Sequence, residues 1–123
     1  KHSYDLDTGK VSDRKPLITF EKSEGSPDGM TIDREGNLWV AFWGGGCIRR
    51  ISPEGKIIGV FKLPVSRVTS VAFGGENLSQ LYITTASYLL NDDELLREPL
   101  AGSLFLMETD TQGFPEHRIN LHS

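Results

Sequence analysis

The chain contains few of the residues that define several classes of protein. Its one cysteine, Cys47, cannot form an internal disulfide, and a lone cysteine on a strand is typical of a small buried side chain. Its three histidines have no zinc-binding spacing with one another or with Cys47. No apolar run approaches the roughly 20 residues of a membrane span. These absences argue against a disulfide scaffold, a zinc cluster and a membrane partner.

The charge is also modest. The net charge is −4 over 123 residues, and a composition of 37% hydrophobic and 24% charged residues is that of a globular domain. The basic residues are scattered and form no stripe that could follow phosphates, so we expect no nucleic-acid partner. Lys1 opens within a strand pattern with no apolar secretory segment before it. We therefore expect a cytoplasmic protein, although a signal on a missing N-terminal half stays open.

The stretch from Ser26 to Phe42 predicts one whole β-hairpin. Apolar and polar residues alternate before the turn, Arg34 to Asn37 has the composition of a tight turn, and a dense apolar run follows it. Pro27 lacks an N–H and is expected just outside the strand ladder, and Gly29 lets the backbone bend. Asp28 is thereby predicted immediately before the first strand of the hairpin.

The same pattern then recurs. Val71 to Phe73 repeats Met30 to Ile32 at a spacing of about 41 residues, and Leu81 to Thr84 repeats Leu38 to Ala41. Trp39 and Tyr82 occupy equivalent positions and are expected to pack between sheets. Repeats of about 40 residues with short strands and tight turns are typical of β-propeller blades.

We therefore predict an all-β fold, a β-propeller segment of about two and a half to three four-stranded antiparallel blades. Residues 1–25 are expected to form the outer half of one blade, with a second strand from Val11 to Phe20. Residues 26–64 form a complete blade, and residues 65–123 a further blade with a long loop at 86–102. A closed propeller needs at least about four blades, so the chain is expected to be incomplete. An ordinary antiparallel sandwich stays open as the alternative.

Successive turns of such sheets alternate between two ends. Asp28, the loop from Trp43 to Gly46, the connector from Pro64 to Thr69 and the loop at 86–102 are expected at one end. Loops as long as 86–102 are often functional, and Asp92 to Arg97 is expected to form a short helical turn within it. This end is the predicted site face.

Pro27-Asp28-Gly29-Met30, with Ile32-Asp33 and then Glu35 to Ala41, resembles the signature of the SMP-30/gluconolactonase/luciferin-regenerating-enzyme family. Phe73-Gly74-Gly75 and Leu81 to Thr84 continue the resemblance, which extends from Tyr4 to about Leu106. It implies a six-bladed propeller with a divalent metal in the central channel, and hydrolysis of a lactone or related ester.

The resemblance assigns Asp28 as a metal ligand and catalytic base. Calcium is the first expectation for the metal, with zinc, magnesium and manganese as alternatives. The other metal ligands of the family, a glutamate and an asparagine, have no counterpart here. Its substrate-contacting arginine and asparagine are absent as well. The 123-residue portion alone is therefore not expected to be active.

Three further residues are candidates for contacts with a substrate at the channel mouth. Thr69 falls opposite Asp28 in the next repeat, Ser70 lies beside it, and Trp43 lies in the loop at the same end. Hydroxyls that only satisfy local backbone are an equally good interpretation of Thr69 and Ser70.

A different class of function also stays open. The chain could be a non-catalytic half-propeller that pairs through exposed strand edges. Its partner would be the missing propeller half or a second copy of the chain.

Overall fold

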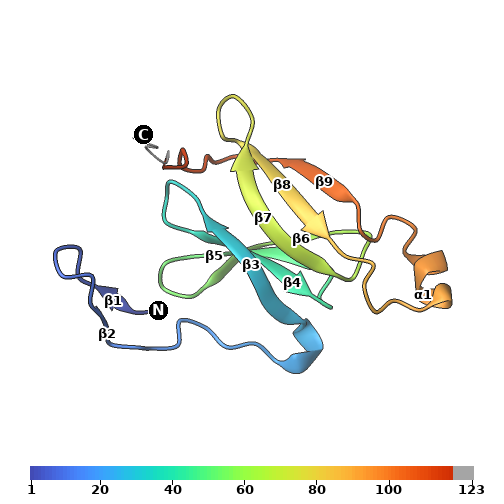
Figure 1. The fold of residues 1–123 in the computed structure, drawn as a ribbon, viewed down its shortest axis with the longest axis horizontal. Helices are drawn as coiled ribbons and strands as arrows, with labels where there is room; N and C mark the ends of the chain where they lie inside the picture. Colours follow the sequence, from blue (N-terminus) through green and yellow to red (C-terminus); the bar gives the residue numbers. More distant parts are fainter. Residues whose placement is uncertain (118–123) are drawn as a thin grey trace, which may run out of the picture.

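The chain is built from antiparallel β-sheets, described for residues 1–117 in a computed structural model (Figure 1). Its elements in order are β1 (Ser3–Tyr4), β2 (Val11–Ser12), the 3-10 helix η1 (Lys22–Glu24), β3 (Ser26–Ile32), β4 (Leu38–Trp43), β5 (Cys47–Ile51), β6 (Ile57–Lys62), β7 (Val68–Gly74), β8 (Gln80–Thr85), α1 (Asp92–Arg97) and β9 (Leu104–Glu108). They form sheets in the orders β1-β2, β3-β4-β5-β6 and β7-β8-β9. The predicted predominance of β-structure is confirmed. Neither helix within residues 1–117 is long and apolar enough to cross a membrane.

The hairpin predicted at Ser26 to Phe42 is confirmed as β3 and β4, and β5 and β6 complete one antiparallel sheet. Gly36 in the turn has a φ of +84°, which glycine adopts without strain. The prediction for Pro27 is wrong, because Pro27 lies inside β3, opposite Phe42. Since β3 is the edge strand of this sheet, proline is tolerated there. Asp28 consequently lies within β3 and not before it.

The N-terminal segment differs most from the sequence prediction. The strand expected from Val11 to Phe20 contains only Val11–Ser12, and both short strands are exposed. Pro16 interrupts the pattern, and the following residues run as irregular chain. Ile18 and Phe20 pack against one face of the first sheet, where the Phe20 ring meets the Phe42 ring edge-on at 4.8 Å. Side-chain packing on the first sheet, and not strand pairing, therefore holds the segment that contains Ile18 and Phe20 in place.

The second sheet contains β7, β8 and β9. β7 and β8 lie where the repeats at Val71 and Leu81 predicted them, and β9 pairs with β8. The helical turn predicted in the long loop is confirmed as α1, whose N-terminus has a capping box between Asn91 and Glu94. Residues 118–123, which the predicted further blade included, lie outside the described part of the chain.

The two large sheets pack face to face around the indole of Trp39. Its ring stacks on Phe61 at 5.1 Å and meets Phe73 edge-on at 5.7 Å. The other buried members of this core are Ala41, Ile48, Val65, Val68, Val71, Leu81 and Ile83. Cys47 is buried in a smaller cluster on the opposite face of the first sheet, as predicted.

A buried carboxylate, that of Asp33, fixes the turn after β3. It accepts hydrogen bonds from Trp39 Nε1 at 2.9 Å, from the Asn37 backbone N at 2.8 Å and from Arg50 Nε at 3.0 Å. Burial alone would raise the pKa of Asp33, but these donors outweigh it and hold the pKa below its ordinary value. The Asp33 carboxylate therefore connects the turn after β3, the Trp39 side chain and Arg50 of β5 by hydrogen bonds.

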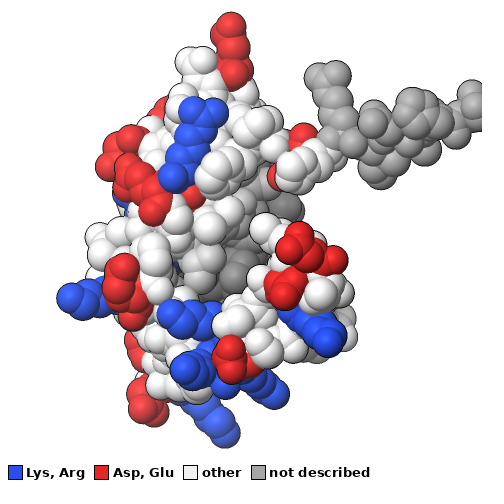
Figure 2. Space-filling model, turned by 90° about the vertical axis from the view of Figure 1, so that its left-hand side faces the viewer, with Lys and Arg blue, Asp and Glu red and all other residues white. Residues whose placement is uncertain are grey.

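The face on the left of Figure 1, shown in Figure 2, carries both signs of charge. Acidic side chains are spread over its upper and middle parts, and basic side chains gather toward its lower edge. No single sign of charge covers this face.

The edge strands β3 and β7 come into direct contact between the sheets. A Cβ placed on Gly29 would lie 2.6 Å from Ser70 Cβ and 2.8 Å from Ser70 Cα. Each strand also has a bulge at this level, between Pro27 and Met30 in β3 and between Val68 and Ser70 in β7. Glycine at position 29 is therefore a requirement of the close approach.

We expect Asp33→Asn to lower the free energy of unfolding at pH 7 by about 3 kcal/mol, because it breaks a buried ion pair with Arg50. Since folding lowers the pKa of Asp33, its stabilisation is present above the ordinary pKa and lost as pH falls through the lowered folded-state value. Urea unfolding from pH 7 to pH 2 should therefore show a weaker loss of stability toward acid pH in the variant. Parallel curves for the two proteins would contradict this role.

We expect Gly29→Ala to lower the free energy of unfolding by about 1 to 3 kcal/mol, because the added methyl group overlaps Ser70. The matched control is Ser70→Ala, which removes an exposed hydroxyl and should change stability by less than about 0.5 kcal/mol. Thermal unfolding followed by circular dichroism measures both. Equal stability of the two variants would show that β3 and β7 do not need the glycine.

Candidate functional site at the start of the edge strands

β3 and β7 begin at the same end of the molecule. Ser26, the first residue of β3, pairs with Trp43, and Trp43 forms a β-bridge with Arg67, which directly precedes β7. The residue before the Gly29 and Ser70 contact is Asp28 in one strand and Thr69 in the other. The structure thus brings Ser70 against the residue that follows Asp28.

Asp28 is available to a ligand. It is exposed, in contrast to Asp33, and it takes no part in the ion pairs among residues 1–117. It lies in the bulge of β3, and bulges re-aim side chains away from the regular strand alternation. A carboxylate presented in this way offers oxygen atoms to a cation or accepts a proton from water.

Thr69 and Ser70 differ in their surroundings. Thr69 Oγ1 lies 2.7 Å from the hydroxyl oxygen of Thr84 on β8, and Thr84 Oγ1 donates to the Ser70 carbonyl at 3.5 Å. The side chain of Ser70 is exposed and packs on Gly29. The hydroxyl of Thr69 is therefore held by another side chain, whereas Ser70 contributes its backbone carbonyl and its contact with Gly29.

Trp43 is half-buried at the same end, and its ring is covered by the Arg67 guanidinium, 5.2 Å from the ring centroid. Arg67 Nη2 also donates to the Leu89 carbonyl at 2.8 Å. The two side chains therefore connect the turn after β4, the connector before β7 and the long loop. This contact gives Trp43 a structural role.

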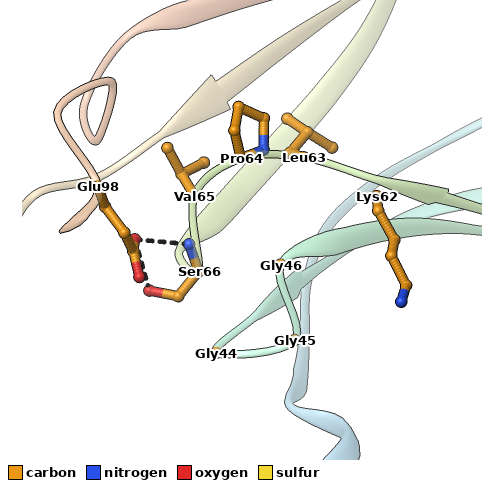
Figure 3. A pocket seen from close by; sticks show the side chains of 9 residues that line it. All are labelled: Gly44, Gly45, Gly46, Lys62, Leu63, Pro64, Val65, Ser66 and Glu98. Carbon is orange, nitrogen blue, oxygen red and sulfur yellow. Dashed lines mark hydrogen bonds between the residues drawn. The ribbon is translucent and has the colours of Figure 1, made fainter.

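The loop at 86–102 is held at this end by the same connector. Ala86 N donates to the Arg67 carbonyl at 2.9 Å, and the Glu98 carboxylate accepts from Ser66 N at 2.7 Å and from Ser66 Oγ at 3.0 Å (Figure 3). Glu98 lines a groove of about 370 Å³ between the loop and the glycine turn at 44–46. Both hydrogen bonds go to one oxygen, Glu98 Oε2, and they hold the loop to the connector.

The Asp28 carboxylate fits one corner of a site for a hard cation, because calcium prefers oxygen ligands. The residue that follows it, Gly29, contacts Ser70 of β7. Cys47 is buried in the cluster with Val40, Phe42 and Ile51. Within the described residues no three His, Cys, Asp or Glu side chains form a metal-binding group. The chain therefore supplies one carboxylate, and a complete set of about six to eight oxygens needs other donors.

Sequence reasoning did not single out Thr84, Arg67 or Glu98. Thr84 could have been found by pairing the predicted strands, because an antiparallel register places it beside Ser70. Arg67 and Glu98 act through contacts between segments that only the folded chain brings together, so no local pattern indicates them.

The chain is similar to known proteins of one family. The family described as "SMP-30/Gluconolactonase/LRE-like region" matches residues 1–87. Regucalcin of Oryctolagus cuniculus is 48% identical over 103 residues, which are 83% of this chain and 34% of that protein. The "Putative sugar lactone lactonase YvrE" of Bacillus subtilis strain 168 is 44% identical over 115 residues, or 93% of this chain and 39% of that protein.

Two solved structures are similar to the chain over most of its length. A luciferin-regenerating enzyme aligns with a TM-score of 0.80 and 42% identity over 92% of this chain and 38% of its own. A regucalcin of Agrobacterium tumefaciens, described as a calcium-binding protein, aligns with a TM-score of 0.79 and 32% identity over 91% and 38%. The chain spans only between a third and two fifths of the length of these proteins. On this evidence the chain belongs to the SMP-30/gluconolactonase/LRE-like family.

Proposed function

We propose that this chain is part of a β-propeller that hydrolyses a sugar lactone or a similar cyclic ester with a divalent metal, and that Asp28 is its metal ligand and general base. The observation that carries the proposal is the exposed Asp28 carboxylate on the bulge of β3, where β3 meets β7. The name of the family, which includes gluconolactonase, supports the reaction class. The name of one relative, a putative sugar lactone lactonase, supports it as well. The calcium-binding description of one structural relative supports the metal.

The packing of the sheets supports the propeller. Each face of the first sheet is at least partly covered, by the second sheet on one side and by Ile18 and Phe20 on the other. Successive sheets that pack face to face, with the first strand of each at a common edge, are the arrangement of propeller blades. Since the chain spans about a third of the rabbit regucalcin, further blades would supply the remaining oxygen ligands.

The chemistry assigned to Asp28 is that implied by the family resemblance. A divalent metal bound there would polarise the lactone carbonyl and lower the pKa of a nearby water. Asp28 takes a proton from the attacking water as the water oxygen bonds to the carbonyl carbon. The ring C–O bond of the ester then breaks, and the proton passes to the departing alkoxide. The loop at 86–102 is held to this end of the molecule by Arg67 and Ser66.

A second candidate function is an assembly module. The observation that favours it is the open face of the second sheet, where Tyr82 is 37%, Leu104 65% and Leu106 54% exposed. In the repeat, Tyr82 corresponds to Trp39, whose face is covered by the neighbouring sheet. A sheet from the missing propeller half or from a second copy of the chain would cover the open face in the same way.

We expect Asp28→Ala to lower metal-dependent lactone hydrolysis by at least about 100-fold in an assembled protein that contains this segment, because both metal ligation and proton transfer are lost. The matched control is Asp93→Ala, which removes an exposed carboxylate from α1 and should leave turnover unchanged. Circular dichroism of both variants should equal that of the parent protein. Unchanged turnover in a folded Asp28→Ala variant would show that Asp28 is neither the metal ligand nor the general base.

The two candidates are separated by comparing the covalent mass of the protein with its native mass from light scattering. If the 123-residue chain is an assembly module, its native mass is a multiple of its covalent mass, and Leu104→Asp with Leu106→Asp returns it to one chain. A native mass of one chain at high micromolar concentration would exclude self-assembly through the open face.

A further inference from the structure

The loop at 86–102 is fixed at its two ends and exposed between them. At its start, Ala86 N donates to the Arg67 carbonyl at 2.9 Å, and at its end Ala101 packs on the core between the sheets. None of the residues from 87 to 100 is buried. The exposed apolar side chains among them are Tyr88, Leu89, Leu95, Leu96 and Leu100. Side-chain burial therefore contributes little to holding the middle of the loop in place.

Two contacts join the middle of the loop to the connector before β7. Within residues 1–117, the hydrogen bonds from residues 87–98 to segments distant in the sequence go to Arg67 and Ser66. Arg67 Nη2 donates to the Leu89 carbonyl at 2.8 Å, and Ser66 N and Oγ donate to Glu98 Oε2 (Figure 3). Because Ser66 and Arg67 are neighbours in the chain, both contacts end on the same short piece of the connector.

The contact at Leu89 carries two unfavourable contributions. Leu89 has a φ of +64°, a left-handed conformation in which the Cβ of leucine crowds the carbonyl oxygen that follows it. Its side chain is 69% exposed, so packing compensates little for this strain. Arg67 Nη1 is buried without a hydrogen-bond partner among residues 1–117, and an unpaired buried donor raises the free energy of the state that contains it.

We propose that residues 87–100 form a lid that opens as one unit, with hinges at Ala86 and Ala101, and that the contacts of Leu89 and Glu98 with the connector break together. Opening relieves the strain at Leu89 and lets water reach Arg67 Nη1, which offsets part of the cost of breaking the contacts. It also frees the Glu98 carboxylate, which lines the groove of about 370 Å³ beside the glycine turn at 44–46. The lid needs no metal, and it is independent of the role proposed for Asp28.

The test is amide hydrogen exchange of the full chain followed by NMR, with the Ser66 amide as the reporter, because it donates to Glu98 in the closed lid. Substitutions at Leu89 change the strain at one contact and leave the groups of the other contact unchanged. Leu89→Asn should slow exchange of the Ser66 amide about fivefold, because asparagine tolerates the left-handed conformation and stabilises the closed lid. Leu89→Val should speed this exchange about fivefold, because a β-branched residue is more strained there.

The matched control is Leu89→Ala, which removes the exposed side chain but keeps the strain, and it should exchange within about twofold of the parent. Glu98→Ala removes the acceptor of the Ser66 amide and gives the exchange rate expected for an open lid. Equal exchange of the Ser66 amide in the asparagine, alanine and valine variants would show that the two contacts open independently, and the lid would be wrong. The amide of Ile83, in the core between the sheets, should exchange alike in all the Leu89 variants. A parallel change at Ile83 would show that the whole fold responds, which contradicts opening of the lid as a separate unit.

Discussion

The structure depends on the burial of one indole, that of Trp39, between the two large sheets. Its ring packs on Phe61 of its own sheet and on Phe73 of the next, and its N–H donates to the buried Asp33 carboxylate. Apolar contact and a charge-assisted hydrogen bond therefore act on the same side chain. Because Asp33 begins the turn after β3, the packing of the sheets and the geometry of the first hairpin are determined together.

The packing of the two sheets also brings β3 close to β7 at Gly29. With the sheets fixed face to face, β3 and β7 meet so closely that only glycine fits at position 29. Each strand has a bulge near this contact, at Asp28 and Gly29 in β3 and at Thr69 in β7. Arg67 and Glu98 hold the long loop to the connector before β7. A carboxylate and a hydroxyl thus share one end, although about 40 residues separate them in the chain.

Much of this arrangement could be predicted from the sequence, where local chemistry determines it. The alternation around Met30 and the turn glycine at 36 define the first hairpin, and the repeat spacing places Thr69 opposite Asp28. The bulge at Asp28 could not be predicted, because it depends on how β3 pairs with β4. The strand expected to reach Phe20 was wrong, since Phe20 packs as irregular chain. The contact between Thr69 and Thr84 requires the register of β7 and β8, which the repeat alone does not specify.

The central claim is that Asp28 presents its carboxylate to a divalent cation at the contact between β3 and β7. The most direct measurement is an anomalous difference map at the manganese edge, from crystals of the chain grown with Mn²⁺. The account predicts a peak at coordination distance from an Asp28 carboxylate oxygen. Peaks confined to other carboxylates, with none at Asp28, would contradict it.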